Sequence, residues 1–249
     1  MERRSTFDRV AELYDRARTT YPADLLDDVA ALGRRMLEIG PGTGQATRAL
    51  VERGVDVTAV ELGSNLAAIA RRNVPQATIV VADFDTWEPE HADFDAVVAF
   101  TSFHWLDPAM KYAKVARLLR AGGALAVTHV DHVTVPGGDS FWADVMEDYD
   151  AVVPSPENVP PPREEEVGDL RADFGSSGAF RSVERRRYRW DVTVTADQWI
   201  DVLGTMSPNI ALDRSVREQL FTRIHARIEA RPAGTVTHHL IATLTIGRT

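Results

Sequence analysis

The chain has 249 residues, of which 44% are hydrophobic and 26% are charged, and both fractions are ordinary for a folded globular protein. Lys and Arg total 28 against 37 Asp and Glu, and the net charge of -9 disfavours a nucleic-acid partner. Cysteine is absent, which excludes disulfides, thiolate catalysis and metal sites with sulfur ligands.

The amino terminus carries basic residues but no apolar run of the length that a secretory signal needs. No uninterrupted apolar stretch reaches the roughly 20 residues that cross a bilayer. We therefore expect a cytoplasmic protein without a membrane partner, present as a monomer or homodimer.

Helical segments and short apolar runs alternate along the first half of the chain. Apolar residues recur at helical spacing over residues 7–17, and Tyr21-Pro22 opens a second helix that reaches Leu32. After Gly33 the predicted strands are 35–39, 56–61, 78–82, 95–100 and 124–129, with helices over 45–53, 65–72 and 109–120 and a turn at Gly122-Gly123. Alternation at this spacing predicts parallel strands joined by right-handed crossovers.

The sequence changes character after Val133. A short helix is predicted over 139–152, and a proline-rich, acidic stretch follows up to Gly178, which we interpret as an insertion or lid. Strands over 183–194 and 235–246, with helices over 196–203 and 213–228, complete the chain. These last strands can finish the sheet as an antiparallel pair.

Gly40, Gly42 and Gly44 lie directly after the first strand and at the start of a helix. Glycine permits backbone angles and a close ligand approach that a Cβ would block. Ligands of open parallel sheets bind beyond the carboxyl ends of the strands, next to such a turn. Glu61 ends the second strand about 20 residues later, where an acidic side chain accepts hydrogen bonds from ribose hydroxyls. Together, the glycine turn and Glu61 predict a nucleotide-like ligand.

The glycine spacing is G-x-G-x-G, whereas a dinucleotide-binding turn prefers G-x-G-x-x-G. The segment LEIGPGTGQAT resembles the first motif of the class I methyltransferases, and the resemblance extends from Arg35 to about Val130. It implies S-adenosylmethionine as cofactor and S-adenosylhomocysteine as product. A nicotinamide-dependent oxidoreductase is an alternative that the order of strands and helices also permits.

The resemblance also implies roles for individual residues. Gly40 and Gly42 are expected at the amino-acid end of the cofactor, and Glu61 on its ribose. Leu62 would flank the adenine, with Asp83 on its exocyclic amine and Phe84 against the ring; the alternative role of Asp83 is a helix cap. The further cofactor contacts that we expect are Tyr14, Arg18, Glu38, Thr43, Gly44, Gln45 and Thr101.

Two of these contacts come from the first helix. Arg18 is expected to pair with the cofactor carboxylate, and Tyr14 either closes over the cofactor or anchors its own helix. The segment around Tyr14 to Arg18, together with residues 101–106, resembles a small-molecule branch near the trans-aconitate methyltransferases. This branch resemblance does not define a substrate.

Methyl transfer from a sulfonium is an in-line displacement, which requires alignment and the exclusion of water. His104, beyond the fourth strand, is the candidate catalytic base for a hydroxyl or protonated amine acceptor. Its alternative role is packing beside Trp105, and a carboxylate acceptor needs no base. The residues expected to bind the acceptor are Tyr21, His104, Trp105, His129 and His132.

The cluster of His129, Asp131 and His132 follows the fifth predicted strand. It could line an acceptor pocket or imitate a metal site, but we interpret it as a solvated turn. We expect no metal, because a metal site also needs a properly arranged further ligand and supporting groups. The segment Met206 to Asn209 could reach the acceptor site but is interpreted as a turn between helices, and Trp199 is interpreted as a core residue instead of part of an aromatic cage.

These patterns predict a single α/β domain over residues 1–249, with a three-layer, doubly wound sheet of seven mostly parallel strands and an antiparallel last strand. We expect N-terminal cap helices over 1–33, the cofactor-binding core over 34–132, a lid at the acceptor site over 133–178, and the strands and helices that complete the sheet over 179–249. The protein would methylate an oxygen, nitrogen or carboxylate of a small molecule. The alternative is a cofactor-binding protein without transfer activity.

Overall fold

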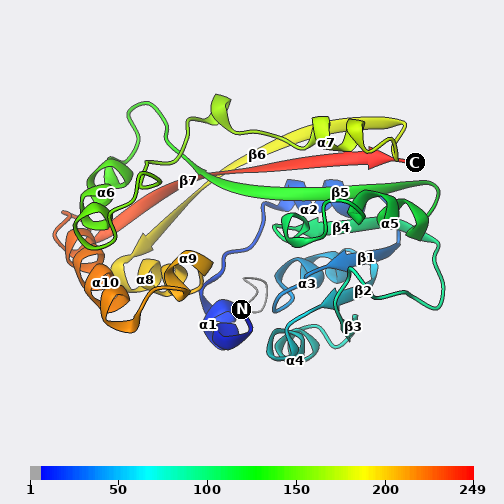
Figure 1. The fold of residues 1–249 in the computed structure, drawn as a ribbon, viewed down its shortest axis with the longest axis horizontal. Coiled ribbons are helices and arrows are strands. Elements are labelled where there is room, and N and C mark those ends of the chain that lie inside the picture. Colours follow the sequence, from blue (N-terminus) through cyan, green and yellow to red (C-terminus); the bar gives the residue numbers. More distant parts are fainter. Residues whose placement is uncertain (1–6) are drawn as a thin grey trace.

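Seven strands form one sheet in the order β3-β2-β1-β4-β5-β7-β6 (Figure 1). The structure is a computed structural model that describes residues 7–249, so the part of the expected N-terminal cap that falls on residues 1–6 lies outside the described residues. The strands from β3 to β5 pair in parallel, and β7 runs antiparallel to both of its neighbours, β5 and β6. The predicted sheet with an antiparallel last strand is confirmed.

Strands and helices largely alternate along the first half of the chain. The strands are β1 (Arg35–Ile39), β2 (Asp56–Glu61), β3 (Thr78–Val81), β4 (Phe94–Phe100), β5 (Leu119–Val133), β6 (Ser182–Thr195) and β7 (Thr235–Arg248). The helices are η2 (Phe7–Val10), α1 (Ala11–Ala17), α2 (Ala23–Ala30), α3 (Gln45–Glu52), α4 (Ser64–Asn73), η3 (Phe103–Trp105), α5 (Lys111–Leu118), α6 (Phe141–Val152), η4 (Glu164–Glu166), α7 (Arg171–Ser176), α8 (Ala196–Gly204), α9 (Ser207–Ile210) and α10 (Arg214–Glu229). Every helix within residues 7–249 is too short or too polar to span a membrane.

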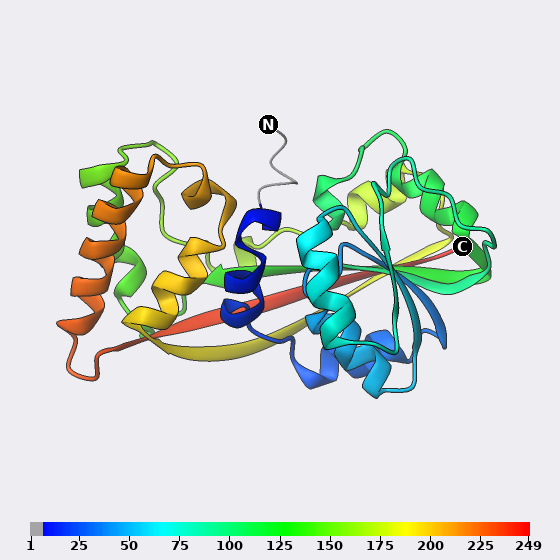
Figure 2. The same ribbon diagram turned by 90° about the horizontal axis from the view of Figure 1, so that it is seen from below.

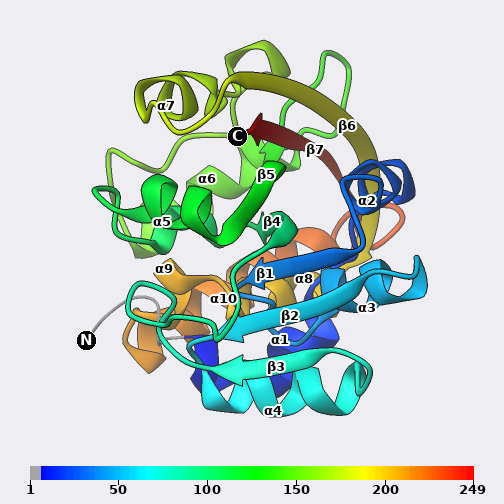
Figure 3. The same ribbon diagram turned by 90° about the vertical axis from the view of Figure 1, so that its right-hand side faces the viewer.

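Helices cover both faces of the parallel strands, with α2 and α3 on one side and α5 on the other (Figure 3). Side chains alternate between the faces, so that Met36 of β1 packs in one hydrophobic cluster and its neighbour Leu37 in the other. Because both faces are buried, these strands are nearly continuous apolar runs. This explains why the sequence shows them so clearly.

The strand β5 is much longer than the predicted segment 124–129. At its start, Phe94 of β4 pairs with Leu119 and Ala96 with Ala124, so the expected glycine turn is an irregularity inside the strand. At its other end, pairing with β7 continues to Val133. The added length comes from this antiparallel pairing, which is a contact with residues more than a hundred positions away.

The strands β5, β7 and β6 extend beyond the parallel part of the sheet and carry a second group of helices (Figures 1 and 2). We call α6, α8, α9 and α10 the helix lobe. Its core contains Phe141 of α6, Trp199 of α8 and Ile224 of α10. The segment 133–178, expected to act as one lid, is divided: α6 belongs to the helix lobe, whereas Phe174 of α7 packs on Tyr112 of α5 at the opposite end.

The helix α1 lies between the parallel-sheet part and the helix lobe (Figure 2). Just before it, the Asp8 carboxylate accepts hydrogen bonds from the backbone N–H groups of Asn65 (2.7 Å) and Leu66 (3.0 Å), which caps α4. On the other side, Arg16 forms an ion pair of 3.1 Å with Asp201 of α8. The first described segment thus connects the two parts.

Ile224 tests whether the helix lobe depends on its own core. The side chain is fully buried, so Ile224→Ala should lower the free energy of unfolding by about 2–5 kcal/mol through lost contacts and a cavity. Gln219→Ala, an exposed change on the same helix, is the matched control and should have little effect. Urea denaturation measures both, and equal stabilities of the two variants would contradict the assignment.

Candidate active site

A cavity of about 470 Å³ opens at the carboxyl ends of the parallel strands and continues between α1 and the helix lobe. Its volume falls in the range of about 300–1,000 Å³ that small-molecule sites occupy. Of the residues that the sequence singled out, the cavity brings together Tyr14, Arg18, Gly40, Gly42, Glu61, Leu62, Asp83, Phe84, Thr101, His104, Trp105 and His132. Glu38, Thr43, Gly44, Gln45, Tyr21 and His129 are placed elsewhere.

The turn after β1 depends on glycine at two positions that line the cavity. Gly40 and Gly42 have φ angles of +66° and +60°, a region that other residues rarely adopt. A Cβ at Gly40 would lie 2.8 Å from the Cβ of Ser102, and one at Gly42 would lie 3.3 Å from the Tyr14 ring. The turn therefore exposes main chain to the cavity where any side chain would be strained and crowded.

Thr43, Gly44 and Gln45 support the turn from behind. The Gln45 side-chain amide donates to the Thr43 hydroxyl at 2.7 Å. Gly44 begins α3 against α4, where a Cβ would lie 3.1 Å from Val74. These residues shape the turn and do not line the cavity.

Glu61 ends β2 with its carboxylate held by two backbone groups. One oxygen accepts from the N–H of Gly42 at 3.0 Å and the other from the N–H of Gly63 at 2.8 Å. The residue is 7% exposed, and burial raises the pKa of its carboxyl although both N–H groups oppose the shift. Each oxygen of a carboxylate has a second lone pair, so the group can still accept hydrogen bonds from a ligand diol.

Glu38 is buried behind the turn instead of lining the cavity. The Thr47 hydroxyl donates to its carboxylate at 2.6 Å. Burial raises the pKa of Glu38 to about 7; the bond from Thr47 opposes this rise, and the charge of Glu61 adds to it.

The end of the cavity next to β2 and β3 is mostly apolar. Leu62, Leu66 and the buried Phe84 line it together with Asp83. The Asp83 carboxylate also accepts from the backbone N–H of Asp85 at 3.0 Å, so it closes a turn as well as lining the cavity. An apolar slot with one carboxylate matches the chemistry of an adenine ring and its amine.

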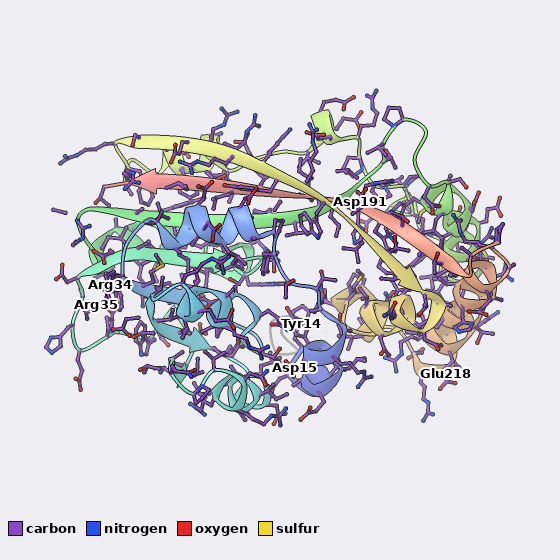
Figure 4. All side chains as sticks on the ribbon, turned by 180° about the vertical axis from the view of Figure 1, so that it is seen from behind. Tyr14, Asp15, Arg34, Arg35, Asp191 and Glu218 are labelled. Carbon is purple, nitrogen blue, oxygen red and sulfur yellow. The ribbon has the colours of Figure 1, made fainter. Side chains whose placement is uncertain are left out.

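Tyr14 and Arg18 face the cavity from the α1 segment. Figure 4 shows Tyr14 and Asp15 between the two parts of the molecule, far from Arg34 and Arg35 at the start of β1. The Arg18 guanidinium lies 5.0 Å from the Tyr14 ring centroid and donates to the Thr205 hydroxyl at 2.9 Å. Burial raises the pKa of Tyr14, so its phenol stays protonated at neutral pH.

Thr101 follows β4 with a φ of +55°, which is costly for a β-branched residue. Its backbone N–H donates to Thr128 of β5 at 2.8 Å, and the hydroxyl of Ser102 donates to the Ile39 carbonyl. These bonds hold a strained residue against the cavity. Tyr21, in contrast, packs on Phe100 with ring centroids 4.8 Å apart and does not line the cavity.

His104 and Trp105 belong to the short helix η3, with ring centroids 4.6 Å apart. Both line the cavity, so His104 packs beside Trp105 and also faces the site. Burial lowers the pKa of His104, and the nearby His129 and Lys111 lower it further. The ring is therefore neutral at pH 7 and able to accept a proton.

The three residues expected to cluster after the fifth strand are separated by strand geometry. They lie within β5, where alternate side chains point to opposite faces. His132 lines the main cavity, whereas His129 and Asp131 line a second hollow with Asp169. Across residues 7–249, His, Asp and Glu side chains form no group that could hold a metal ion.

The cavity also contains residues that the sequence reasoning missed or set aside. Met206, Ser207 and Pro208, interpreted as a turn, line it from the helix lobe. Trp199 is a core residue as predicted, and it also borders the cavity. His238 of β7 was not considered. The alternation of side chains along the last strands groups His238 with other residues on one face of the sheet. Which face meets the cavity is known only once the strand pairing is known.

The fold is Rossmann-like, and its main cavity opens at the carboxyl ends of the parallel strands. Residues 37–127 match the Methyltransf_11 family, described as a methyltransferase domain. An uncharacterized methyltransferase of Mycobacterium tuberculosis is 27% identical over 229 residues, which cover 92% of this chain and 87% of that protein.

Two further proteins are similar to this chain, one in sequence and one in fold. A trans-aconitate 2-methyltransferase of Rhodopseudomonas palustris is 32% identical over 127 residues, which are 49% of each protein. A solved structure described as a type II methyltransferase from Anaeromyxobacter dehalogenans matches with a TM-score of 0.67 and 21% identity, covering 93% of this chain and 97% of that chain. These similarities identify residues 37–127 as a methyltransferase domain and support S-adenosylmethionine-dependent methyl transfer, and none of them supports the nicotinamide alternative.

The hydrogen-bonded carboxylate of Glu61 is the first site feature to test. Glu61→Gln places an amide N–H opposite one backbone N–H and removes the charge, so S-adenosylhomocysteine should bind about tenfold to a hundredfold more weakly. Glu52→Gln, an exposed position on α3, is the control and should bind as the wild type does. Calorimetric titration measures the affinity of each variant for S-adenosylhomocysteine. An unchanged affinity in Glu61→Gln would contradict a ribose contact.

The buried Glu38 makes stability depend on pH. Its pKa rises from 4.5 to about 7 on folding, so the stabilisation from its proton is complete below pH 4.5 and is lost as pH rises through about 7. The full change corresponds to roughly 3 kcal/mol. Between about pH 5 and about pH 8, the free energy of unfolding should decrease less in Glu38→Gln than in the wild type, as measured by urea denaturation. An identical decrease in both proteins would show that the pKa of Glu38 is not raised by folding.

Proposed function

We propose that the protein transfers the methyl group of S-adenosylmethionine to an oxygen or nitrogen, including a carboxylate oxygen, of a small-molecule acceptor. The observation that carries this proposal is the continuity of one cavity. The glycine turn and Glu61 line one part of it, and Trp199, Met206 and His238 of the opposite part come from the helix lobe and β7. One cavity thus joins the proposed cofactor site to a second set of side chains that an acceptor can contact.

The residues present fit the cofactor. The exposed main chain at Gly40 and Gly42 suits its amino-acid end, since a Cβ there would occupy the space. The Glu61 carboxylate suits the ribose diol, and the slot lined by Leu62 and Phe84 suits the adenine. When bound, the cofactor supplies a methyl carbon whose bond to sulfur breaks, with the electron pair leaving on sulfur, as the acceptor atom bonds to that carbon.

The chain's own contribution is alignment, exclusion of water and removal of a proton. Residues 7–18, which include η2 and α1, are tied to α4 through Asp8 and to α8 through Arg16, and in the proposed mechanism they close the cavity between the two parts. Closure keeps the reacting atoms in line and strengthens local electrostatics. For a hydroxyl or amine acceptor, the neutral His104 ring takes the proton that the acceptor loses.

Transfer activity and the role of His104 can be tested together. The protein is incubated with methyl-labelled S-adenosylmethionine and a panel of hydroxylated, amino and carboxylic small molecules. For a hydroxyl or amine acceptor, His104→Gln should slow transfer at least about 100-fold. The wild-type rate should rise with pH through a value below 6.5, where His104 loses its proton, and this rise should disappear in the variant.

His91→Gln is the control for this experiment, because His91 lies in an exposed loop and does not line the cavity. It should leave both the rate and its pH profile unchanged. A full rate in His104→Gln would overturn the role of His104 as base. Firm binding of S-adenosylhomocysteine without transfer to any acceptor would favour the alternative of a cofactor-binding protein without transfer activity.

A further inference from the structure

The helix-lobe end of the cavity has a floor made from one face of three strands. His132 of β5 pairs with Leu240 of β7, and Val192 of β6 pairs with His238, so these side chains share a face. His132 and His238 are two positions apart in register, and their ring centroids lie 5.1 Å apart. Both rings line the cavity.

The two imidazoles lack the hydrogen bonds that buried polar groups normally make. His238 is 2% exposed, and neither of its ring nitrogens has a partner among residues 7–249. The Nδ1 atom of His132 is also buried and has no partner among the same residues. Because an unpaired buried polar group is costly, its presence at a cavity wall points to a ligand that supplies the missing bond.

Both imidazoles are neutral at physiological pH. Burial, together with the charge of Arg18, lowers the pKa of His132 to about 4. Burial, followed by His132, lowers the pKa of His238 to about 3, although Asp139 opposes the shift. A neutral imidazole has one donor and one acceptor, which matches a hydroxyl group that both donates and accepts. A carboxylate only accepts and would bring an unpaired charge to this wall.

The surroundings of the pair are flat and apolar. The Trp199 ring lies 3.9 Å from the His238 ring, centroid to centroid, with 31° between their planes. Val130, Leu240 and Met206 also line the cavity. Stacked rings and aliphatic side chains favour a planar, apolar ligand body.

The charges of the cavity disfavour an acidic acceptor. Among residues 7–249, Arg18 is the only Lys or Arg that lines it, against two acidic residues, Glu61 and Asp83. The guanidinium of Arg18 already donates to both the hydroxyl and the carbonyl of Thr205. A polycarboxylate such as trans-aconitate would therefore meet fewer cations than it has carboxylates.

We propose that the acceptor is an uncharged aromatic compound with a hydroxyl group, and that His132 and His238 hold this hydroxyl while Trp199 lies along the ring. The inference rests on the proposed function and narrows its acceptor class. His132 and His238 then determine specificity by anchoring the acceptor through this hydroxyl, whereas His104 takes the proton from the separate acceptor group that is methylated.

A matched pair of probes tests this acceptor class without requiring turnover. 2-Naphthol and 2-naphthoate have the same ring system, but at neutral pH one is an uncharged hydroxyl compound and the other a carboxylate. Titrated into the protein saturated with S-adenosylhomocysteine, 2-naphthol should bind at least tenfold more tightly than 2-naphthoate, and trans-aconitate should bind more weakly still. Equal or tighter binding of either carboxylate would overturn the proposal.

Variants and spectroscopy locate the contact. His132→Leu and His238→Leu should each weaken 2-naphthol binding at least tenfold while S-adenosylhomocysteine affinity is retained, and His91→Leu should change neither. Because a variant in this packed cluster can fail to fold, histidine ¹⁵N signals of the wild type provide a second measurement. 2-Naphthol should shift the signals of His132 and His238 but not the signal of His91. If the His132 and His238 signals do not move at saturating 2-naphthol, the proposal is wrong.

The outcomes separate this inference from the function on which it rests. Loss of the proposed transfer activity would appear as no labelled product with any acceptor, while the binding preferences are measured independently. Transfer to carboxylates with tight 2-naphthoate binding would retain the proposed function and reject the acceptor class.

Discussion

The hydrogen bond from the Gly42 backbone N–H to the Glu61 carboxylate joins the glycine turn to the end of β2, and the cavity is organised around it. The turn can offer this N–H only because Gly40 and Gly42 adopt positive φ angles. A buried carboxylate needs such donors, since burial alone disfavours its charge. One local contact therefore satisfies an acidic group, orients a loop and leaves main chain open to a ligand.

The second constraint is the extension of three antiparallel strands past the parallel sheet. Pairing of β5 with β7 up to Val133 creates a platform that carries the helix lobe. Strand alternation then assigns His132 to the cavity and His129 to the other face. The same geometry that completes the sheet thus supplies the floor of the proposed acceptor site, and Tyr14 and Ala17 of α1 line the same cavity.

The parallel part of the sheet could be predicted well from the sequence because its signals are local. Buried parallel strands such as β1 and β2 are short apolar runs, and the helices between them show regular periodicity. The ends of β5 could not be predicted, since they depend on pairing with β7. Neither could the split of 133–178, because α6 and Phe174 of α7 find their partners in different parts of the chain.

The candidate site divides in the same way. The sequence by itself determined the class of protein, the glycine turn and the acidic residue after β2, because a ligand cradle of this kind is encoded within about 25 consecutive residues. Only the tertiary structure decided that Met206 to Pro208, Trp199 and His238 face the cavity, and that His132 joins them while His129 and Tyr21 do not. These placements follow from strand register and helix packing between distant segments, which no local pattern specifies.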